Sequence, residues 1–405
     1  MSIKIDSYQQ VYNQKALEKN ISANFGRQYQ QCSISVMDTI ADPDITFDEK
    51  GISNYYYEYI KVEKEKCLKG KDGLKKQKYW ANKIKNSKKG GEYNCILGLS
   101  GGADSTYLAY LAKELGLCPL LVHFDYGWNS ETATINVENV VKNTGFDLYT
   151  VVMDWPEFKN LQRSYFKASV IDLDVPADHM IFGTLYQTAK NYGIKYVLNG
   201  NNVWSEHTLP KTWNYNKFDI INLKNIHKTF ENTSLKHLPA LGLWQSFYYE
   251  LFNNIKKVCF LDWQEYNLEE IKNKIENKLE WKSYGWKHHE SVFTRFYQGY
   301  ILLRKFNVDK RKAHLSNLIF SEQITKNDAE EELLKPPYPL KMQEDDFSFV
   351  AKKLGFTEDE FEGVLLLDNF PHQNYGTDYQ LRQRYYRFMK FIKPFSTIVK
   401  RLLRR

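Results

Sequence analysis

The chain lacks the features that mark secreted, membrane-spanning and disulfide-stabilised proteins. Its 405 residues contain no run of about 18 apolar side chains, so we expect no transmembrane helix. Residues 1–14 are polar and hold no apolar segment of the kind found in signal peptides. The five cysteines are scattered and odd in number, which does not fit a disulfide framework. We therefore expect a cytoplasmic protein with reduced thiols.

The chain also lacks a basic body, although its formal net charge is +7. Residues 381–405 contain nine Lys and Arg side chains and no acid, so the remainder of the chain is slightly acidic. Enzymes that act on nucleic acids usually carry basic surface around the site itself. The charge distribution therefore argues against a nucleic-acid partner.

Residues 91–225 alternate between short apolar strands and helical segments. We expect strands at 95–99, 119–125, 147–154 and 195–200, and helices at 105–115, 130–144 and 178–192. This alternation predicts an α/β domain with a parallel sheet covered by helices on both faces. Ligands of such sheets bind beyond the carboxyl ends of the strands.

The flanking regions have a different texture. We expect a polar extension at 1–31, an acidic, turn-rich segment followed by a helix over 55–89 within 32–90, a mainly helical region at 226–380, and a basic tail at 381–405. Within the helical region the patterns predict helices at 244–257, 291–306, 326–334 and 345–354, and a short strand at 258–261. The chain therefore divides into one sheet-based domain and a helical C-terminal region.

The first predicted strand runs into Ser100-Gly101-Gly102-Ala103-Asp104-Ser105 and then directly into a helix. Glycines let the backbone approach a polyanion, and the free amides of a helix N-terminus attract phosphate. The two serine hydroxyls add hydrogen-bond donors. A carboxylate beside phosphates is sensible when Mg²⁺ bridges them, which makes Asp104 the expected magnesium ligand. The alternative is a tight strand–helix turn with a Ser or Asp cap.

This loop is neither a Walker loop, since no Gly-Lys-Ser/Thr follows, nor a dinucleotide fingerprint, whose glycine spacing differs. It resembles the pyrophosphate loop of the ATP pyrophosphatase (PP-loop) superfamily, whose HUP-like adenine-nucleotide-binding fold matches the predicted sheet. Those enzymes adenylate a carbonyl oxygen with ATP so that a nitrogen or sulfur nucleophile can displace AMP. The resemblance implies ATP and Mg²⁺ as cofactors.

Longer segments narrow the resemblance. Residues 120–158 ("LLVHFDYGWNSETATINVENVVKNTGFDLYTVVMDWPEF"), 174–206, 284–325 and 331–338 resemble bacterial N-acetyl sugar amidotransferases of surface-polysaccharide (LPS O-antigen or nonulosonic acid) biosynthesis. That family converts an N-acetyl group of a nucleotide-activated sugar into an acetamidino group. The resemblance implies adenylation of the amide oxygen, release of pyrophosphate, and displacement of AMP by ammonia.

The chain shows no glutaminase of its own. Residue 2 is Ser, and none of the five cysteines stands in a Gly-x-Cys-x-Gly elbow. The resembled family works with a separate glutamine amidotransferase (glutaminase) subunit and a cyclase-like barrel subunit. We therefore expect ammonia to come from such partners.

Several polar residues beyond the loop are candidates for the site. As cofactor-binding residues we expect Ser100, Gly101, Gly102, Asp104, Ser105, Asp125, Gly200 and Asn201; as catalytic residues Asp104, Ser105, Lys287 and His288; and as substrate-binding residues Trp128, Asn129, Glu131, Asp178, His179, Glu206, Glu290, Arg311 and His314. Lys287, His288 and Glu290 fall on motif positions of the resembled family, whereas His289 replaces an expected aromatic. The residues after the strands have an alternative role as loop caps, Asp178 as a helix N-cap, and the Lys287 cluster as a solvated helix start.

The resembled family commonly carries two Cys-x-x-Cys pairs near its start, like a small zinc knuckle. Here the four places read Cys32, Ser35, Ser53 and Tyr56. Ser is a poor zinc ligand and Tyr a rare one, so we expect no zinc at this degenerate knuckle.

The tail interleaves bases with Tyr, Phe, Ile and Leu. It is either a basic amphipathic segment that contacts the anionic inner face of a membrane, or a disordered or partner-docked tail. Two other functions stay open for the whole chain. They are a PP-loop enzyme that modifies transfer RNA, against which the slightly acidic body argues, and a non-catalytic subunit, against which the intact loop argues.

Overall fold

The computed structural model describes residues 27–87 and 91–392, the last four by their backbone alone. Most of the expected extension 1–31 and the end of the expected tail, 393–405, lie outside the described residues. Five parallel strands form one sheet in the order β3-β2-β1-β4-β5. They are β1 (Cys95–Gly98), β2 (Pro119–Asp125), β3 (Leu148–Val152), β4 (Tyr196–Leu198) and β5 (Lys256–Val258). The predicted parallel α/β fold is confirmed.

Successive residues of the central strands point to opposite faces of the sheet, and each face is covered by helices. The covering helices are α5 (Ala103–Glu114), α6 (Glu131–Thr144) and α12 (Leu268–Leu279) on one face and α8 (Val175–Asn191) on the other. Leu97 and Leu198 belong to the core under α5 and α12. Their neighbours Ile96 and Val197 belong to the core under α8. Burial on both faces explains why these strands read as continuous apolar runs.

The two edge strands differ from what the sequence predicts. Leu148, Tyr149 and Val152 of β3 are exposed, so the expected cover on both faces does not reach this edge. At the other edge, β5 pairs in parallel with β4. The sheet therefore extends past residue 225, where we expected its domain to end. The helix expected over 244–257 stops early, as α11 (Leu243–Leu251), because the chain must extend to enter β5.

The helix expected over 55–89 is two helices, α3 (Asn54–Lys66) and α4 (Gly70–Lys85). The chain is extended at Cys67, and the backbone amide of Leu68 donates to the carbonyl of Asp262. A side chain at Gly73 would meet the carbonyl oxygen of Trp263 at 2.5 Å. The expected helix is interrupted between α3 and α4 because the backbone of α4 at Gly73 packs closely on the backbone of Trp263.

Several helices are present that the sequence pattern did not reveal. They are α7 (Trp155–Ala168), α9 (Val203–Glu206), α10 (Ile220–Phe230), α12, α15 (Arg311–Phe320) and α18 (Glu358–Leu365), with the 3-10 turns η2 (Lys211–Trp213), η3 (Leu261–Trp263) and η5 (His372–Tyr375). The start of α7 carries a recognisable signal, since Asp154 caps the amide of Glu157 and Pro156 stands in the first turn. Cap and proline together predict a helix start.

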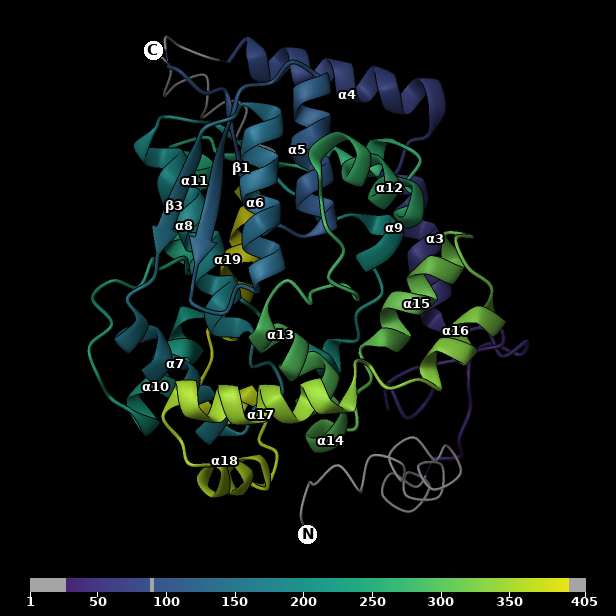
Figure 1. The fold of residues 1–405 in the computed structure, drawn as a ribbon, viewed down its shortest axis with the longest axis vertical. Helices are drawn as coiled ribbons and strands as arrows, with labels where there is room; N and C mark the ends of the chain where they lie inside the picture. The colour runs from purple at the N-terminus through teal and green to yellow at the C-terminus, as the bar shows by residue number, and fades with distance from the viewer. Residues whose placement is uncertain (1–26, 88–90, 393–405) are drawn as a thin grey trace.

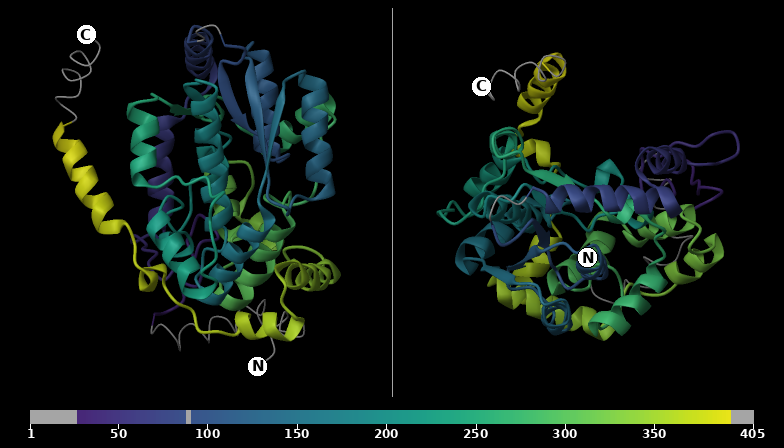
Figure 2. Two further views of the ribbon diagram at one scale, coloured as in Figure 1. Left: turned by 90° about the vertical axis from the view of Figure 1, so that its left-hand side faces the viewer. Right: turned by 90° about the horizontal axis from the view of Figure 1, so that it is seen from above.

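The mainly helical C-terminal region is confirmed. Its remaining elements are α13 (Val292–Phe296), the π-helical turn η4 (Tyr297–Ile301), α14 (Leu302–Phe306), α16 (Lys326–Leu333), α17 (Leu340–Leu354) and α19 (Tyr379–Ile392). Figure 1 shows α13, α14, α17 and α18 below the carboxyl ends of the strands. Figure 2 shows α19 standing off one side of the molecule. No helix among the described residues is long and apolar enough to span a bilayer.

An aromatic core joins the two parts of the chain. Trp128, which follows β2, packs against Phe293 of α13 with ring centroids 5.4 Å apart. Phe293 in turn contacts Phe166 of α7. These side chains are buried. These aromatic contacts fix the C-terminal helices beneath the sheet.

Candidate functional site

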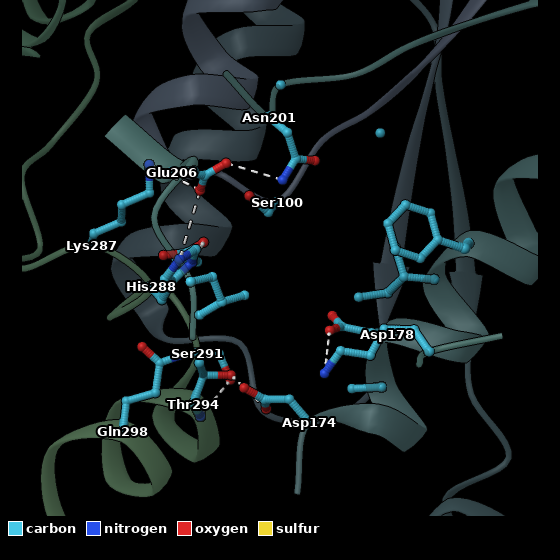
Figure 3. Close-up of a pocket in the computed structure, with 18 of the residues that line it drawn as sticks. Ser100, Asp174, Asp178, Asn201, Glu206, Lys287, His288, Ser291, Thr294 and Gln298 are labelled. Carbon is cyan, nitrogen blue, oxygen red and sulfur yellow. Dashed lines mark hydrogen bonds and ion pairs between the residues drawn. The ribbon is translucent and has the colours of Figure 1, made fainter. Parts of the chain in front are cut away.

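A cavity of about 600 Å³ lies beyond the carboxyl ends of β1, β2 and β4. Its walls come from the strand ends, from α8, from α9 and from residues 286–302 of the C-terminal region. Figure 3 shows Ser100, Asn201, Glu206 and Lys287 at one end of the cavity and Asp174, Asp178, Thr294 and Gln298 at the other. The cavity stands where ligands of parallel sheets bind, and its two ends differ in chemistry.

The loop between β1 and α5 has a fixed shape. Gly101 has a φ of +81°, and an added Cβ would meet the carbonyl oxygen of Ala133 at 2.4 Å, so no larger residue fits. The carbonyl of Gly101 accepts hydrogen bonds from the side-chain amide of Asn136 (3.2 Å) and the indole of Trp281 (3.0 Å). Both donors are buried. The loop is thus held in place from behind before any ligand binds.

The two predicted loop serines face each other. The hydroxyls of Ser100 and Ser105 lie 3.2 Å apart, and the Ser100 hydroxyl accepts from the amide of Gly102. Tyr284 accepts from the amide of Ala103 through its hydroxyl. Gly200, after β4, packs against the N-terminus of α5, where a Cβ would lie 3.4 Å from the Ser105 amide. Hydroxyls and helix amides therefore converge at one end of the cavity, as a phosphate cradle requires.

The Lys287 ammonium joins this loop to the C-terminal region. It lies 2.7 Å from a carboxylate oxygen of Asp104 and 3.0 Å from one of Glu206. Burial alone would lower the pKa of Lys287, but the two negative charges outweigh it and raise the pKa. Burial likewise opposes ionisation of Glu206, yet Lys287 lowers its pKa. Lys287 and Glu206 therefore form an ion pair at neutral pH.

Asp104 and Glu206 are further oriented by uncharged groups. The Tyr266 hydroxyl and the Asn202 amide donate to Asp104, and the Asn201 amide donates to Glu206 at 3.0 Å. Two carboxylates thus converge on one position, which the Lys287 ammonium fills in this structure. This is an oxygen-donor set of the kind that Mg²⁺ prefers.

His288 and Glu290 extend the site from Lys287. His288 has a φ of +67°, a conformation that non-glycine residues adopt at a cost and that is enriched at functional sites. Burial and the nearby lysines hold its pKa well below the ordinary value, so the imidazole is neutral. Burial raises the pKa of Glu290 to about 7. One carboxyl oxygen of Glu290 is buried without a hydrogen-bond partner, and the other lies beside Gly102.

The opposite end of the cavity is acidic. Lys217 pairs with Asp172 at 2.6 Å and with Asp178 at 3.2 Å. Asp174 accepts from the Thr294 hydroxyl, and burial together with the charge of Asp178 raises its pKa to about 7. Three carboxyl groups stand here with Lys217 and Lys310, and they can accept hydrogen bonds from hydroxyl or amino groups. This end suits a neutral polar ligand.

The π-helical turn η4 contributes to this end. It interrupts the helix between α13 and α14 for five residues, and Gln298 lies within it. Gln298 lines the cavity, as Figure 3 shows. Gly299 packs against the ring of Tyr338, where a Cβ would lie only 2.6 Å away. Such turns occur often at functional sites, because they redirect side chains without ending the helix.

The structure brings many of the predicted site residues to this one cavity. Those that line it are Ser100, Asn129, Asp178, Gly200, Asn201, Glu206, Lys287, His288, Glu290, Arg311 and His314. Gly101, Gly102, Asp104 and Ser105 stand directly behind this lining through the contacts described above. Arg311 has a structural role at the cavity wall, because its guanidinium donates to Asp309 and to two backbone carbonyls.

Four predicted residues have other places. Trp128 is buried in the aromatic core and donates to Gln162. His179 is also buried, between the carbonyl of residue 217 and the amide of residue 241. Asp125 orders the turn after β2 through the amide of residue 127, and Glu131 is exposed at the start of α6. None of these four side chains lines the cavity, so their expected ligand contacts are not supported.

Other cavity groups were missed by the sequence analysis. They are Asp172, Asp174, Lys217, Tyr266, Tyr284, Thr294, Gln298 and Lys310. Little in the sequence indicates that Asp174 belongs to the site. An acidic residue just before Val-Pro at a helix start is usually a helix cap. Tyr284, Thr294, Gln298 and Lys310 lie within 284–325, which resembles the family, but no single-residue pattern marked them. Asp172, Lys217 and Tyr266 come from segments without motifs and reach the site only through tertiary packing.

The degenerate knuckle keeps its shape through hydrogen bonds. The Ser53 amide donates to the Cys32 sulfur at 3.3 Å, and Lys326 of α16 donates to the Cys32 carbonyl at 2.8 Å. Although burial raises it, hydrogen bonds from Ser35 and Ser53 lower the pKa of the Cys32 thiol. Tyr56 instead packs against Phe320. One thiol with two hydroxyls does not fit a structural zinc site.

We expect Lys287→Met to lower the free energy of unfolding by about 3 kcal/mol, because it leaves two carboxylates, each only 19% exposed, without their shared cation. Adding Glu206→Gln should recover part of this loss. Urea unfolding of both variants measures it. Lys142→Met is the matched control, since Lys142 pairs with Glu280 on the surface and should cost under about 1 kcal/mol. Equal losses in the two single variants would contradict the assignment.

Glu290→Gln should change the pH dependence of stability. The unfolded carboxyl ionises near its ordinary pKa of 4.5, whereas the folded one stays protonated to about 7. Between these values the unfolded state binds fewer protons, so the wild type loses stability relative to Glu290→Gln as pH rises, by up to about 3 kcal/mol at pH 8. Urea unfolding from pH 5 to 8 tests this. Glu231→Gln should give no such trend, because Lys167 and Arg163 outweigh burial and lower the pKa of Glu231.

Two parts of the chain match models of known protein families. Residues 94–191 match the family model described as queuosine biosynthesis protein QueC. Residues 290–393 match the model described as LPS biosynthesis protein WbpG-like, C-terminal domain. The first match contains the loop, and the second contains Glu290, Thr294 and Gln298.

Individual relatives cover shorter parts. An uncharacterized protein of Methanocaldococcus jannaschii is 30% identical over 171 residues, which is 41% of this chain and 57% of that protein. The tRNA(Ile)-lysidine synthase of Chlamydia pneumoniae is 39% identical over 72 residues, 17% of this chain and 23% of that protein. The chain therefore spans less than two thirds of either relative.

Among solved structures, NMN synthetase from Francisella tularensis is similar, with 17% identity and a TM-score of 0.28, over 54% of this chain and 98% of that one. The sheet and its loop, together with the two family matches, lead to one assignment. The chain joins a PP-loop domain of the QueC type to a WbpG-like C-terminal domain of the kind found in LPS biosynthesis proteins.

Proposed function

We propose that this protein is an ATP-dependent amidotransferase that converts the N-acetyl group of a nucleotide-activated sugar into an acetamidino group. One observation carries the proposal: the loop of the QueC-matched region and residues 290–298 of the WbpG-like region line a single cavity. A nucleotide bound at the loop therefore faces a ligand bound by the region that resembles LPS biosynthesis proteins.

The loop end of the cavity fits ATP. The Ser100 and Ser105 hydroxyls and the α5 amides provide donors for phosphate oxygens, and Lys287 provides a cation. Asp104 and Glu206 would hold Mg²⁺, which when bound neutralises phosphate charge. Lys287 occupies the position between these carboxylates in the structure, and it would turn toward the phosphates when a metal takes its place.

The acidic end of the cavity fits the sugar. Asp174, Asp178, Thr294 and Gln298 present acceptors and donors for ring hydroxyls at a distance from the phosphate cradle. We infer that the sugar ring binds here with its N-acetyl group directed toward His288 and the loop.

The chemistry then needs positioning more than proton transfer. The acetamide oxygen attacks the α-phosphorus of ATP, the bond to pyrophosphate breaks, and an adenylated imidate forms. Ammonia adds to the imidate carbon and AMP leaves with the former amide oxygen, so an amidine remains. Lys287 stabilises the charge that develops on the phosphates. The neutral imidazole of His288 stands between Glu206 and Glu290, where it can take up the proton that the added ammonia loses.

Ammonia must reach this site from elsewhere. None of the five cysteines, all of which are described, lines the cavity. Burial raises the pKa of Cys67, Cys95 and Cys259, which makes their thiols poor nucleophiles. Cys118 is exposed, but it precedes β2 and therefore lies at the amino ends of the strands, opposite the cavity. We therefore propose that a separate glutaminase, with a cyclase-like barrel subunit, supplies the ammonia.

A second candidate is an enzyme that modifies transfer RNA. It is favoured by the match of 72 residues to a tRNA(Ile)-lysidine synthase. The acidic end of the cavity argues against it, because a transfer-RNA site needs basic surface near the loop. A non-catalytic subunit is disfavoured by the intact loop and its buried supports.

Purified protein with ATP, Mg²⁺, ammonium chloride and a panel of nucleotide-linked N-acetyl sugars should form AMP and pyrophosphate. Mass spectrometry should detect a product lighter by the difference between an oxygen atom and an NH group. Asp104→Ala should lower the rate at least about 100-fold, because phosphate charge is then poorly neutralised. Glutamine should replace ammonium only when a glutaminase subunit is added.

Two results would count against this function. AMP formation with transfer RNA and with no sugar would favour the second candidate. Failure to form AMP with every sugar at high ammonium would indicate a non-catalytic subunit. Glu131→Gln is a suitable control, because Glu131 is exposed and lies outside the cavity, and it should leave the KM for ATP unchanged.

Gln298→Leu should raise the KM for the sugar about tenfold while the KM for ATP changes little. The substitution preserves side-chain volume but removes one hydrogen bond at the acidic end, which is worth roughly 1.4 kcal/mol. Initial rates at varied sugar and varied ATP separate the two effects. Gln187→Leu, on an exposed position of α8 outside the cavity, is the control. An equal rise in both KM values would contradict a sugar site here.

A further inference from the structure

Helix α11 carries a strip of exposed apolar side chains. Trp244, Tyr248, Leu251 and Phe252 occupy neighbouring positions on its outer face, and Trp244 and Phe252 are 60% and 68% exposed. Tyr248 and Phe252 stack with centroids 5.7 Å apart, so the strip is continuous. Single exposed apolar residues are ordinary, but a continuous aromatic strip indicates a contact surface.

Helix α19 stands beside this strip. Tyr385 packs against Phe247 of α11 with ring centroids 5.8 Å apart. Beyond this contact α19 projects from the body of the protein, as both views of Figure 2 show. Tyr386 and Phe388 are 54% and 60% exposed. Two helices that are far apart in sequence therefore present aromatic side chains on one side of the molecule.

The charge around the aromatic strip is positive. Arg384 and Arg387 of α19 are exposed, as are Lys256 and Lys257 of the edge strand β5. The Lys190 ammonium lies 5.3 Å from the ring of Tyr248. The one acidic side chain of α11 is Glu250, and burial raises its pKa. We call Trp244, Tyr248, Leu251 and Phe252 with these five bases the basic aromatic surface.

We propose that the basic aromatic surface binds anionic lipid bilayers, with the α11 side chains entering the headgroup region and the bases contacting lipid phosphates. Trp and Tyr favour that depth because their rings are apolar with one polar atom. The Lys and Arg residues match the negative surface charge. The charge favours a bilayer over a second copy of this chain, because two such surfaces brought together would repel each other.

This inference extends the sequence-based idea of a membrane-contacting tail in one respect. The aromatic anchors lie on α11, near the middle of the chain, and α19 contributes mainly charge. The proposal does not depend on the amidotransferase function, since none of these residues lines the cavity except Lys257 at its margin.

Co-sedimentation of the full chain with vesicles tests the proposal. The protein should bind vesicles of phosphatidylcholine that contain about 30 mol% phosphatidylglycerol much more tightly than vesicles of phosphatidylcholine alone. Salt should weaken the binding. Each base near an anionic surface adds about fivefold to the partition coefficient. Arg384→Glu with Arg387→Glu should therefore lower it at least about 25-fold. Trp244→Ala with Phe252→Ala should lower it on both kinds of vesicle.

Two control variants match these changes elsewhere on the surface. Leu74→Ala with Leu334→Ala removes two exposed apolar side chains, and Lys61→Glu with Lys64→Glu reverses two exposed charges on α3. Neither should change binding by more than about twofold, an allowance for the weaker long-range effect of net charge. Because all the substituted side chains are exposed, each variant should fold.

Three results would overturn the proposal. The first is no binding of the wild type to anionic vesicles at low salt. The second is an equal effect of the control variants, which would reduce the binding to net charge. The third is a wild-type dimer by light scattering that Trp244→Ala with Phe252→Ala converts to a monomer, which would assign the surface to self-association.

Discussion

The ammonium of Lys287, held between the carboxylates of Asp104 and Glu206, is the interaction on which the site depends. It ties the loop after β1, the short helix after β4 and the segment that leads into α13 to one point. The charges compensate one another, so each can remain ionised with little exposure to water. Removing Lys287 leaves two buried carboxylates without their shared cation, and this makes the three residues a single electrostatic unit.

That unit stands at the junction of two regions with separate family resemblance. The QueC-like part supplies the sheet and the phosphate loop, whose shape is set by Gly101, Asn136 and Trp281. The WbpG-like part supplies Glu290, Thr294 and Gln298. Because the aromatic core around Trp128 and Phe293 fixes one region against the other, the two ends of the cavity keep a constant separation. A reaction between two bound substrates requires such a fixed separation.

Charge is divided by location in this protein. The cavity holds alternating charges that compensate one another, from the Lys287 unit to the pairs of Lys217 with Asp172 and Asp178. Of the nine bases in residues 381–405, four belong to α19 and five lie outside the described residues. The net charge of +7 therefore does not describe the surroundings of the cavity, where opposite charges lie side by side.

The sequence by itself determined the parallel sheet and the loop. Both depend on local sequence. Short apolar runs that alternate with helical segments specify buried strands, and Gly101 and Gly102 specify the turn into α5. It also singled out Lys287, His288 and Glu290, through a family pattern. Only the tertiary structure decided their surroundings, because Tyr266 belongs to no motif and reaches Asp104 across a long stretch of chain. It also removed Trp128 and His179 from the site, since an aromatic ring after a strand or an imidazole in the first turns of a helix can serve the core or a ligand equally well until packing fixes where it points.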